Sequence, residues 1–396
     1  MSLVFNYIGV SLSLSDLPRL FLSHTTDNPS VFFIYQFFYF LMGVFRDLLT
    51  VVYVTWRQYL YTSGALLTLT WKWMTKGKDY FVEYVYPEPE CLKNWNHKYV
   101  QLKDIRMHYV EEGPVDGEVL LMVHGFPEFW YSWRFQLEYF KRTHRCIAID
   151  MRGYNTTDRP SGISNYNMSL LIDDIRQFIE TLGLKKVTLA AHDWGAMICW
   201  RVAMLHENLI DRLIICNVPH PIAFYEAYKI SKEQREKSWY IYLFQSQYIP
   251  EIAMRSNKMR MLEAMFRGNK AGIRNSQNFT DEDMLAWKHV FSQPGGTTGP
   301  LNYYRDLFNA PSIPRKLVVV QPKVLILWGD EDEFLDKKGA ELSVKFCRNG
   351  RVQKIRGASH WVQQDQPELV NAYMEQFMKE DNYRVVENLN EFKSHL

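Results

Sequence analysis

Residues 187–205 read VTLAAHDWGAMICWRVAML, and this stretch decides the fold class. Its first five residues, Val187 to Ala191, form a short continuous apolar run, which is typical of a strand buried on both faces of a sheet. From Ala196 to Leu205 the apolar residues take helical spacing. The segment HDWG at 192–195 therefore lies where a strand ends and a helix begins, as expected in a parallel α/β sheet.

Apolar runs of the same kind recur along the chain, and helical patterns separate several of them. Ser169 to Leu182 is one such pattern: Ser169 is its predicted N-cap, and Gly183 follows its end. Strand, helix and strand in succession predict a doubly wound α/β domain with a mostly parallel sheet. Further strands are predicted at Val119–Val123, Cys146–Ile149, Leu213–Ile215 and Val324–Leu327, with a hairpin over Tyr99–Glu111.

One long segment breaks this alternation. From about Pro219 to Pro322 the sequence is helical in pattern, rich in Tyr, Phe and Met, and without a comparable strand run. We interpret it as a helical lid inserted into the α/β domain. The predicted divisions are an N-terminal hydrophobic region at 1–85, a polar, Pro-containing linker at 86–97, the first part of the core at 98–218, the lid at 219–321, the second part of the core at 322–385 and a tail at 386–396.

Composition narrows the possible partners. The chain has 396 residues with 46 basic and 44 acidic side chains, and its net charge of +2 gives no electrostatic basis for binding nucleic acid. Its five cysteines are odd in number and form no CxxC pair, so we expect reduced thiols. We therefore expect neither a nucleic-acid partner nor a metal.

The N-terminal region has the composition of a membrane-seeking segment. Val31–Phe45, VFFIYQFFYFLMGVF, carries no charge, and Leu48–Trp71 is interrupted only by Arg57. As a helix the uncharged run is about 22 Å long, shorter than the hydrocarbon core of roughly 30 Å, so it needs flanking residues to cross. We predict a transmembrane helix here. The alternative is a pair of helices that lie in the membrane interface or pack on the globular domain.

Basic residues beside this region bear on its orientation. Lys72, Lys76 and Lys78 follow the second apolar stretch closely. By the positive-inside rule they put the large C-terminal part of the chain on the cytosolic side. We expect a protein of the endoplasmic reticulum membrane that faces the cytosol and contacts membrane lipid through its N-terminal segment.

The HDWG turn resembles a nucleophile elbow, whose usual pattern is G-x-S-x-G. Asp193 occupies the nucleophile position, Gly195 keeps the second small position, and Ala191 replaces the first. An ionised carboxylate needs no proton removed and can displace at a saturated carbon, leaving an ester on the enzyme. The alternative is a tight turn in which Asp193 merely caps the following helix.

Three further motifs follow, two of them at predicted strand ends and the third near the end of the domain. The HGFP turn at 124–127 exposes the N–H of Phe126, which together with the N–H of Trp194 can form an oxyanion hole. Asp332 ends the segment GDED after the strand Val324–Leu327, and its GxxD spacing favours it over Asp330, Glu331 and Glu333. His360 follows in ASHW. Acid nucleophile, acid and histidine thus occur in the chain order of α/β-hydrolase triads.

The residues from about Lys98 to Met378 resemble the α/β-hydrolase-fold epoxide hydrolases, particularly the membrane-associated animal type. The resemblance implies an α/β-hydrolase fold in which Asp193 is the nucleophile, His360 activates water and Asp332 orients His360. The motifs that carry it are HGFPEFWYSWR at 124–134, RGYNTTDRP at 152–160, HDWG at 192–195 and SHWVQQDQP at 359–367.

The same resemblance implies two lid tyrosines that grip the epoxide oxygen. The candidates are Tyr240, in SWYIYLFQ, and Tyr304, in GPLNYYRD. Their neighbours Tyr242 and Tyr303 leave each choice open by a position or two. The alternative is that lid tyrosines only fill the apolar face of the lid.

These residues predict an epoxide hydrolase that needs no cofactor, takes a lipophilic epoxide and water, and forms a vicinal diol, with fatty-acid epoxides as the leading substrates. Two alternatives stay open. A haloalkane dehalogenase shares the aspartate nucleophile, although Phe126 stands where its halide-binding Asn or Gln is common. A membrane-tethered binding protein with an inactive hydrolase pocket is the other, and fold analogy alone does not exclude it.

Overall fold

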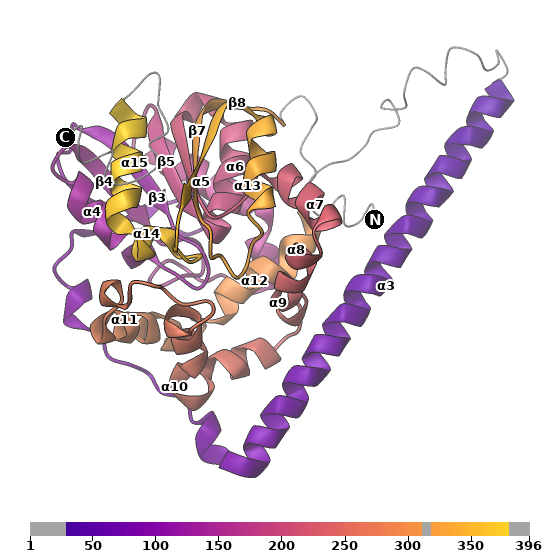
Figure 1. The fold of residues 1–396 in the computed structure, drawn as a ribbon, viewed down its shortest axis with the longest axis horizontal. Coiled ribbons are helices and arrows are strands. Elements are labelled where there is room, and N and C mark those ends of the chain that lie inside the picture. The colour runs from indigo at the N-terminus through magenta and orange to yellow at the C-terminus, as the bar shows by residue number, and fades with distance from the viewer. Residues whose placement is uncertain (1–28, 311–317, 380–396) are drawn as a thin grey trace.

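The computed structural model describes residues 29–310 and 318–379, with side chains described at positions 45, 48 and 49 and from 51 onward. An eight-stranded sheet with the order β1-β2-β4-β3-β5-β6-β7-β8 forms its centre (Figure 1). The pairs β1–β2 and β2–β4 are antiparallel, and the others are parallel. The strands are β1 His97–Gln101, β2 Arg106–Glu112, β3 Glu118–Val123, β4 His144–Ile149, β5 Val187–His192, β6 Ile210–Cys216, β7 Val320–Gly329 and β8 Cys347–Ile355.

Helices flank the sheet, and those after β3, β5 and β8 follow strands closely in the chain (Figure 1). Helix α4 contacts α15, and α5 contacts α6. The expected doubly wound, mostly parallel α/β fold is therefore confirmed. The core helices are α4 Arg134–Phe140, α5 Met168–Thr181, α6 Asp193–Leu205, α13 Lys338–Ser343, α14 Val362–Asp365 and α15 Pro367–Lys379.

Each predicted apolar run forms a strand, because its side chains are buried on both faces of the sheet. Leu120 to Val123 of β3 and Leu213 to Cys216 of β6 are completely buried. The predicted hairpin is the β1–β2 pair, in which Tyr99 lies opposite His108. The sequence reading did not include β8, whose residues are mostly half-buried or exposed and which pairs only with β7. An edge strand of this kind lacks the apolar run that marked the others.

The predicted N-cap of the helix after β4 is wrong by two positions. Asn167, not Ser169, is the N-cap of α5, and its side chain accepts a hydrogen bond from the N–H of Leu170. Both residue types favour this position, so composition alone did not separate them. The C-terminal prediction agrees with the structure: Gly183, with φ of +66°, follows the end of the helix.

The lid lies between β6 and β7 and covers the carboxyl ends of the strands (Figure 1). In the sheet, Val123 pairs with Ala191 and His192 pairs with Cys216, so the segments that follow β3, β5 and β6 emerge at the same edge. The lid helices are α7 Pro221–Ile230, α8 Lys232–Lys237, α9 Trp239–Leu243, α10 Ile249–Arg267, α11 Asp281–Ser292 and α12 Thr298–Asp306.

In the described part of the N-terminal region, one continuous helix forms, α3 Pro29–Lys76. No helix in the described part of the chain combines the length and apolarity needed to cross a membrane, so the predicted transmembrane helix is not supported. The C-terminal half of α3 packs on lid helices α9 and α10. Arg57 lies over the rings of Tyr61 and Tyr242, each 5.0 Å from the ring centroid, and Val54 is buried. This packing agrees with the alternative of an N-terminal helix held against the globular domain.

Candidate active site

Asp193 stands at the bend between β5 and α6, as the elbow pattern predicts. Its φ is +46°, in the left-handed region that L-residues rarely adopt. Two glycines make room for the bend: a Cβ on Gly195 would lie 2.4 Å from the carbonyl oxygen of His124, and a Cβ on Gly125 would lie 2.2 Å from Cβ of Asp193. The bend therefore requires glycine at both positions and presents the Asp193 side chain at the carboxyl edge of the sheet.

The Asp193 carboxylate is directed at Phe126 and His360 rather than at the N–H groups of its own helix. The N-cap of α6 is His192, and Asp193 Oδ1 accepts a hydrogen bond of 2.7 Å from the N–H of Phe126. The alternative in which Asp193 only caps the helix is therefore wrong. Asp193 Oδ2 lies 3.5 Å from Nε2 of His360, on the side away from Phe126.

His360 is held by Asp332. His360 Nδ1 donates to Asp332 Oδ2 over 2.7 Å, which leaves Nε2 directed at Asp193. Asp332 is 3% exposed and accepts three more hydrogen bonds, from the Nδ2 of Asn217 and the N–H groups of Phe334 and Leu335. The carboxylate next to the histidine therefore has every lone pair engaged and a fixed orientation.

Two of the neighbouring acids in the GDEDE segment have other partners. Asp330 accepts from the N–H of Gly357, and Glu331 forms an ion pair of 2.7 Å with Arg274. Among these acids, Asp332 is the one that contacts His360, which is the choice that the GxxD spacing favoured.

Burial and neighbouring charges shift the pKa values of His360 and Asp193 in opposite directions. Burial alone lowers the pKa of His360, but the Asp332 and Asp193 carboxylates outweigh it and raise this pKa to about 10. Burial likewise raises the pKa of Asp193, yet the hydrogen bond to His360 holds it below its usual value. The resting site thus contains two carboxylates and one imidazolium.

The structure separates the two candidate tyrosines from their neighbours. Tyr240, in α9, and Tyr304, in α12, line the same space as Asp193, and their ring centroids are 6.0 Å apart. Tyr303 instead donates to the carbonyl of Arg152, and Tyr242 shares a 2.6 Å hydrogen bond with Tyr228. Of these four tyrosines, Tyr240 and Tyr304 are the two that line both spaces beside Asp193.

Burial, and then the Asp193 carboxylate, raise the pKa of Tyr240 and of Tyr304 well above the usual range. Both phenols therefore keep their protons at neutral pH. The N–H of Trp194 lies in the first turn of α6, where helical N–H groups have no intrahelical partner. Near Asp193 the chain thus has the N–H of Phe126, which donates to Oδ1, the N–H of Trp194 in the first helical turn, and two phenols that line the adjoining space.

A second buried network supports the triad, and sequence reasoning missed it. Glu128 Oε2 accepts from His192 Nδ1 over 2.6 Å and from the N–H of Gly125 over 2.9 Å. His192 Nε2 in turn donates to the carbonyl of His360 over 2.9 Å. Asn217 was also missed, although it follows β6 directly, at the sheet edge where the other motifs gather. Within residues 29–310 and 318–379, no cluster of His, Cys, Asp or Glu is arranged to hold a metal ion.

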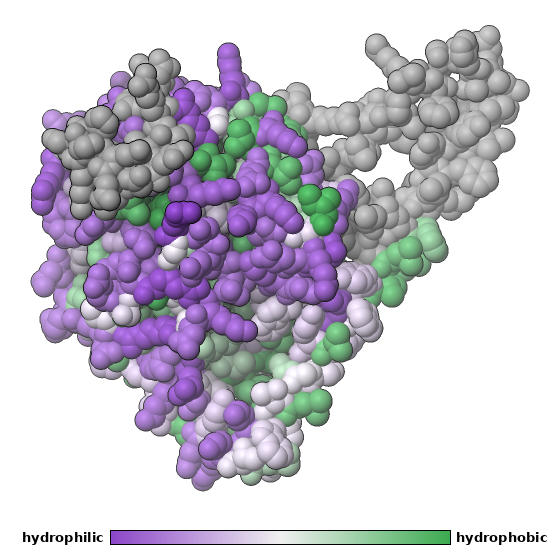
Figure 2. All heavy atoms as spheres, viewed as in Figure 1, coloured by the Kyte–Doolittle hydropathy of each residue, from purple (hydrophilic) through white to green (hydrophobic). Residues whose placement is uncertain are grey.

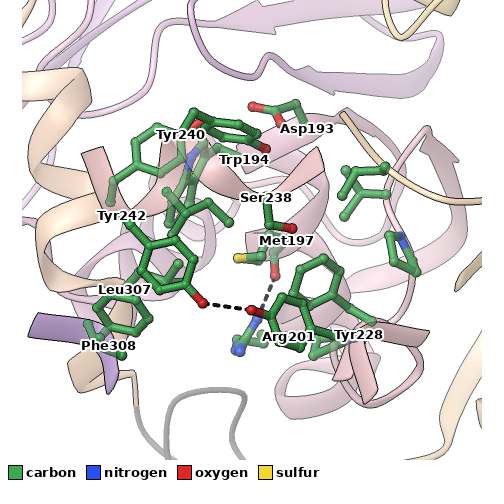
Figure 3. A pocket seen from close by; sticks show the side chains of 18 of the residues that line it. Asp193, Trp194, Met197, Arg201, Tyr228, Ser238, Tyr240, Tyr242, Leu307 and Phe308 are labelled. Carbon is green, nitrogen blue, oxygen red and sulfur yellow. Dashed lines mark hydrogen bonds between the residues drawn. The ribbon is translucent and has the colours of Figure 1, made fainter. Parts of the chain in front are cut away.

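Two arms of a pocket meet at Asp193, Tyr240 and Tyr304. The apolar arm runs along α6 from Asp193 past Met197 to Arg201 (Figure 3), and residues of α3 also line it. The histidine arm runs past His360. The apolar arm includes Tyr53, Val54, Met197, Arg201, Val218, Tyr228, Tyr242 and Phe308; the histidine arm includes Phe126, Lys237, Trp239, Lys270, Phe334 and Trp361.

Known proteins are similar to this chain in sequence and fold. Residues 118–367 match the family model described as alpha/beta hydrolase fold. The chain is 83% identical over 355 residues to Epoxide hydrolase 2 of Caenorhabditis elegans, covering 90% of this chain and 100% of that protein. It is 41% identical over 300 residues to Epoxide hydrolase 4 of Homo sapiens, covering 74% and 82%. A crystal structure of Bacillus megaterium epoxide hydrolase in complex with an inhibitor superposes with a TM-score of 0.66 at 30% identity, covering 72% and 100%.

Proposed function

The chain belongs to the epoxide hydrolases of the α/β-hydrolase fold, and from that premise we propose that it converts lipophilic epoxides to vicinal diols through an ester on Asp193. The observation that carries the proposal is the position of Asp193 Oδ2. Asp193 lines both pocket arms together with Tyr240 and Tyr304, and its Oδ2 lies 3.5 Å from Nε2 of His360. A carboxylate placed in this way is suited to attack a strained ring carbon while donors hold the ring oxygen.

In the first step Asp193 Oδ2 attacks one carbon of the epoxide. A bond forms between Oδ2 and that carbon, and the bond from the carbon to the ring oxygen breaks. Tyr240 and Tyr304 donate hydrogen bonds to this oxygen, and one of them transfers its proton as negative charge develops. Asp193 Oδ1 stays on the N–H of Phe126, so the carboxylate keeps its orientation during the attack.

In the second step water attacks Cγ of the Asp193 ester. His360 takes a proton from the water through Nε2, and Asp332 stabilises the imidazolium that results. The tetrahedral intermediate carries its negative charge on Oδ1, where the N–H groups of Phe126 and Trp194 donate to it. Before it acts as a base, His360 gives the proton that it carries at rest to the tyrosine that had donated its own. When the Cγ–Oδ2 bond breaks, Oδ2 takes the proton of the new hydroxyl on Cγ and leaves with the diol, and the site returns to the Asp193 carboxylate and the His360 imidazolium.

The preferred substrates in this proposal are epoxides of fatty acids. The apolar arm is lined mainly by aliphatic and aromatic side chains, and it is long enough to follow α6 away from the nucleophile. The histidine arm continues on the other side of Asp193. A pocket with the reacting group near its middle suits a chain-like molecule whose epoxide is internal rather than terminal.

Single turnover in water enriched in ¹⁸O tests the covalent route. With enzyme in excess over a neutral aryl epoxide, the label should enter the Asp193 carboxylate, because water attacks Cγ. The Asp193→Asn variant should lose activity, and Asp330→Asn, whose carboxylate serves the Gly357 N–H instead, should keep it. Label found only in the diol would contradict an ester intermediate. Halide release from a bromoalkane without epoxide turnover would instead support the dehalogenase alternative.

We also propose that α3 binds a membrane surface on the cytosolic side, with the endoplasmic reticulum as the membrane. Figure 2 shows white and green atoms along the described part of α3, where Trp71 is 61% and Trp73 is 60% exposed. Exposed aromatic side chains favour the headgroup layer, and the lysines near them are attracted to anionic lipids of the cytosolic leaflet. The full chain should float with vesicles of phosphatidylcholine and phosphatidylserine.

The double variant Trp71→Ser, Trp73→Ser should float less with these vesicles. Tyr248→Ser, which removes an aromatic side chain that is 72% exposed on the lid, is the matched control. Equal flotation of all three proteins would contradict a role for α3 in lipid binding. Fractionation of cells that express the full chain tests the choice of membrane.

A further inference from the structure

The apolar arm contains a buried cation. Arg201 is 2% exposed and lines this arm (Figure 3). Its Nη1 donates to the carbonyl of Met197 over 3.1 Å, and its Nε is buried without a hydrogen-bond partner. No carboxylate in the described part of the chain forms an ion pair with it. The guanidinium therefore meets an otherwise apolar pocket with most of its donors unused.

A buried charge of this kind is unusual in a folded protein. Buried arginines are normally paired, because a charge taken out of water without a partner destabilises the fold. Burial lowers the pKa of Arg201 to about 10, so the side chain still carries its charge at neutral pH. Its neighbour His220 is neutral, because burial, followed by the repulsion from Arg201, lowers the pKa of this histidine to about 3. The described part of the chain therefore supplies no anion to balance the guanidinium.

Two phenols lie in the same arm. The hydroxyls of Tyr228 and Tyr242 are 2.6 Å apart, and Figure 3 shows them on the Arg201 side of the pocket, away from Asp193. Tyr53 of α3 lines the same arm and also hydrogen-bonds Tyr228. A chain of three hydroxyls uses two protons within itself, which leaves one proton to donate to a ligand. A guanidinium and a phenol together suit a carboxylate, which accepts hydrogen bonds through both oxygens.

The distance from this cation to the nucleophile is set by one helix. Asp193, Met197 and Arg201 are four residues apart on α6, so they share a face of the helix that borders the arm. Eight residues at a rise of about 1.5 Å separate Asp193 from Arg201 by about 12 Å. An extended hydrocarbon chain, with C–C bonds of about 1.5 Å in a zigzag, covers this distance with roughly eight to ten carbons.

We propose that Arg201 binds the carboxylate of an epoxy fatty acid and thereby holds an epoxide eight to ten carbons away at Asp193. The inference rests on the proposed function and adds to it a head-group site and a preferred position of the ring. In this arrangement the acid lies along α6 with its carboxylate on Arg201 and its epoxide below Tyr240 and Tyr304, and the remaining chain enters the histidine arm.

A comparison of an acid with its ester tests the head-group site. The substrates are cis-9,10-epoxyoctadecanoic acid, its methyl ester, and styrene oxide, which has no chain. Wild type should prefer the free acid to the ester. Arg201→Met should lose about 10- to 100-fold in kcat/KM for the acid through a higher KM, while its values for the ester and for styrene oxide stay within a few-fold. Arg201→Lys should recover part of the loss, and Lys232→Met, which removes an exposed lid cation, should leave all three values unchanged.

The outcomes separate this inference from the proposed function. If Arg201→Met lost kcat/KM equally for the acid and the ester, the head-group site would be overturned. Continued turnover of styrene oxide in that experiment would leave the hydrolase function in place. Absence of turnover with every epoxide in wild type would overturn the proposed function itself.

A binding measurement does not depend on turnover. Octadecanoic acid, which has no epoxide, should raise the melting temperature of wild type and not that of Arg201→Met. A variant that melts no lower than wild type without ligand shows that the substitution leaves the fold intact, as expected when an unpaired buried charge is removed. Equal shifts in both proteins would contradict carboxylate binding at Arg201.

The position of the ring gives an independent check of the spacing. With octadecanoic acids that carry the epoxide at carbons 6,7, at 9,10 or at 15,16, kcat/KM should be highest for the 9,10 isomer in wild type. The difference should shrink in Arg201→Met, because the carboxylate no longer sets the register of the chain. A preference for the 15,16 isomer would contradict the spacing of about 12 Å along α6.

Discussion

Replacing Asp332 by Asn tests the orientation of His360 with a single atom changed. The Asp332 carboxylate accepts from four donors: His360 Nδ1 and Asn217 Nδ2 on Oδ2, and the N–H groups of Phe334 and Leu335 on Oδ1. An asparagine has one acceptor oxygen and one NH₂ group, so its NH₂ group must face two groups that are themselves hydrogen-bond donors. The better orientation keeps the oxygen on the two backbone N–H groups.

That orientation turns the new NH₂ group toward Asn217 and His360. Nδ1 of His360 must then accept a hydrogen bond, so the proton of the neutral imidazole moves to Nε2, the atom that should take a proton from water. We expect ester hydrolysis to slow by about 10³- to 10⁴-fold, the cost of holding a catalytic histidine in the wrong tautomer. A factor of 10⁴ corresponds to about 5.5 kcal/mol of lost transition-state stabilisation.

Formation of the ester should survive this change, since Asp193 keeps its hydrogen bond from Phe126. The Asp332→Asn enzyme mixed with an epoxide should therefore gain the mass of one substrate, which intact-protein mass spectrometry measures, and the added mass should map to Asp193. Asp330→Asn is the matched control and should turn over without a trapped ester. Ester hydrolysis within tenfold of wild type in Asp332→Asn would refute the assigned role of Asp332.

Three further predictions follow from the site. Tyr304→Phe should slow ester formation by about 100-fold in a stopped-flow assay, whereas Tyr303→Phe should keep the rate and lose about 1 kcal/mol of stability with the hydrogen bond to a backbone carbonyl. Gly195→Ala should lower the free energy of unfolding by about 1–3 kcal/mol in thermal denaturation, because its Cβ would meet the carbonyl of His124. Since the folded pKa of His360 is raised from 6.5 to about 10, its charge stabilises the fold fully below pH 6.5, and the stability advantage of wild type over His360→Gln should decline as pH rises to 10.

The sequence predicted the parallel strands because strands buried on both faces need continuous apolar runs. It also predicted the elbow, because a left-handed bend at Asp193 leaves no room for a side chain at position 195 and the glycine found there is visible in the sequence. It did not predict β8, since an edge strand such as Cys347–Ile355 can be largely polar. Nor did it separate Tyr240 from Tyr242, because two residues of a short lid helix differ in direction only once the helix is packed.

Arg201 shows a different limit of sequence reasoning. A single arginine in the apolar helix MICWRVAML is visible in the sequence, and so is its spacing of eight residues from Asp193. Whether such a residue reaches solvent, meets a carboxylate or stays unpaired depends on the elements that pack around α6. The burial of its Nε atom, without a partner, is a property of the folded chain.

The charges of the triad also determine which of the two proposed steps occurs first. At rest, two carboxylates keep His360 protonated, so it cannot take a proton from water. The same imidazolium keeps Asp193 ionised and ready to attack. Ester formation neutralises Asp193 and removes one of the two charges that raise the pKa of His360. This pKa must then fall while Asp332 still fixes the ring, so His360 becomes a base only once the substrate is attached. A histidine with no such coupling would be able to activate water before the ester had formed.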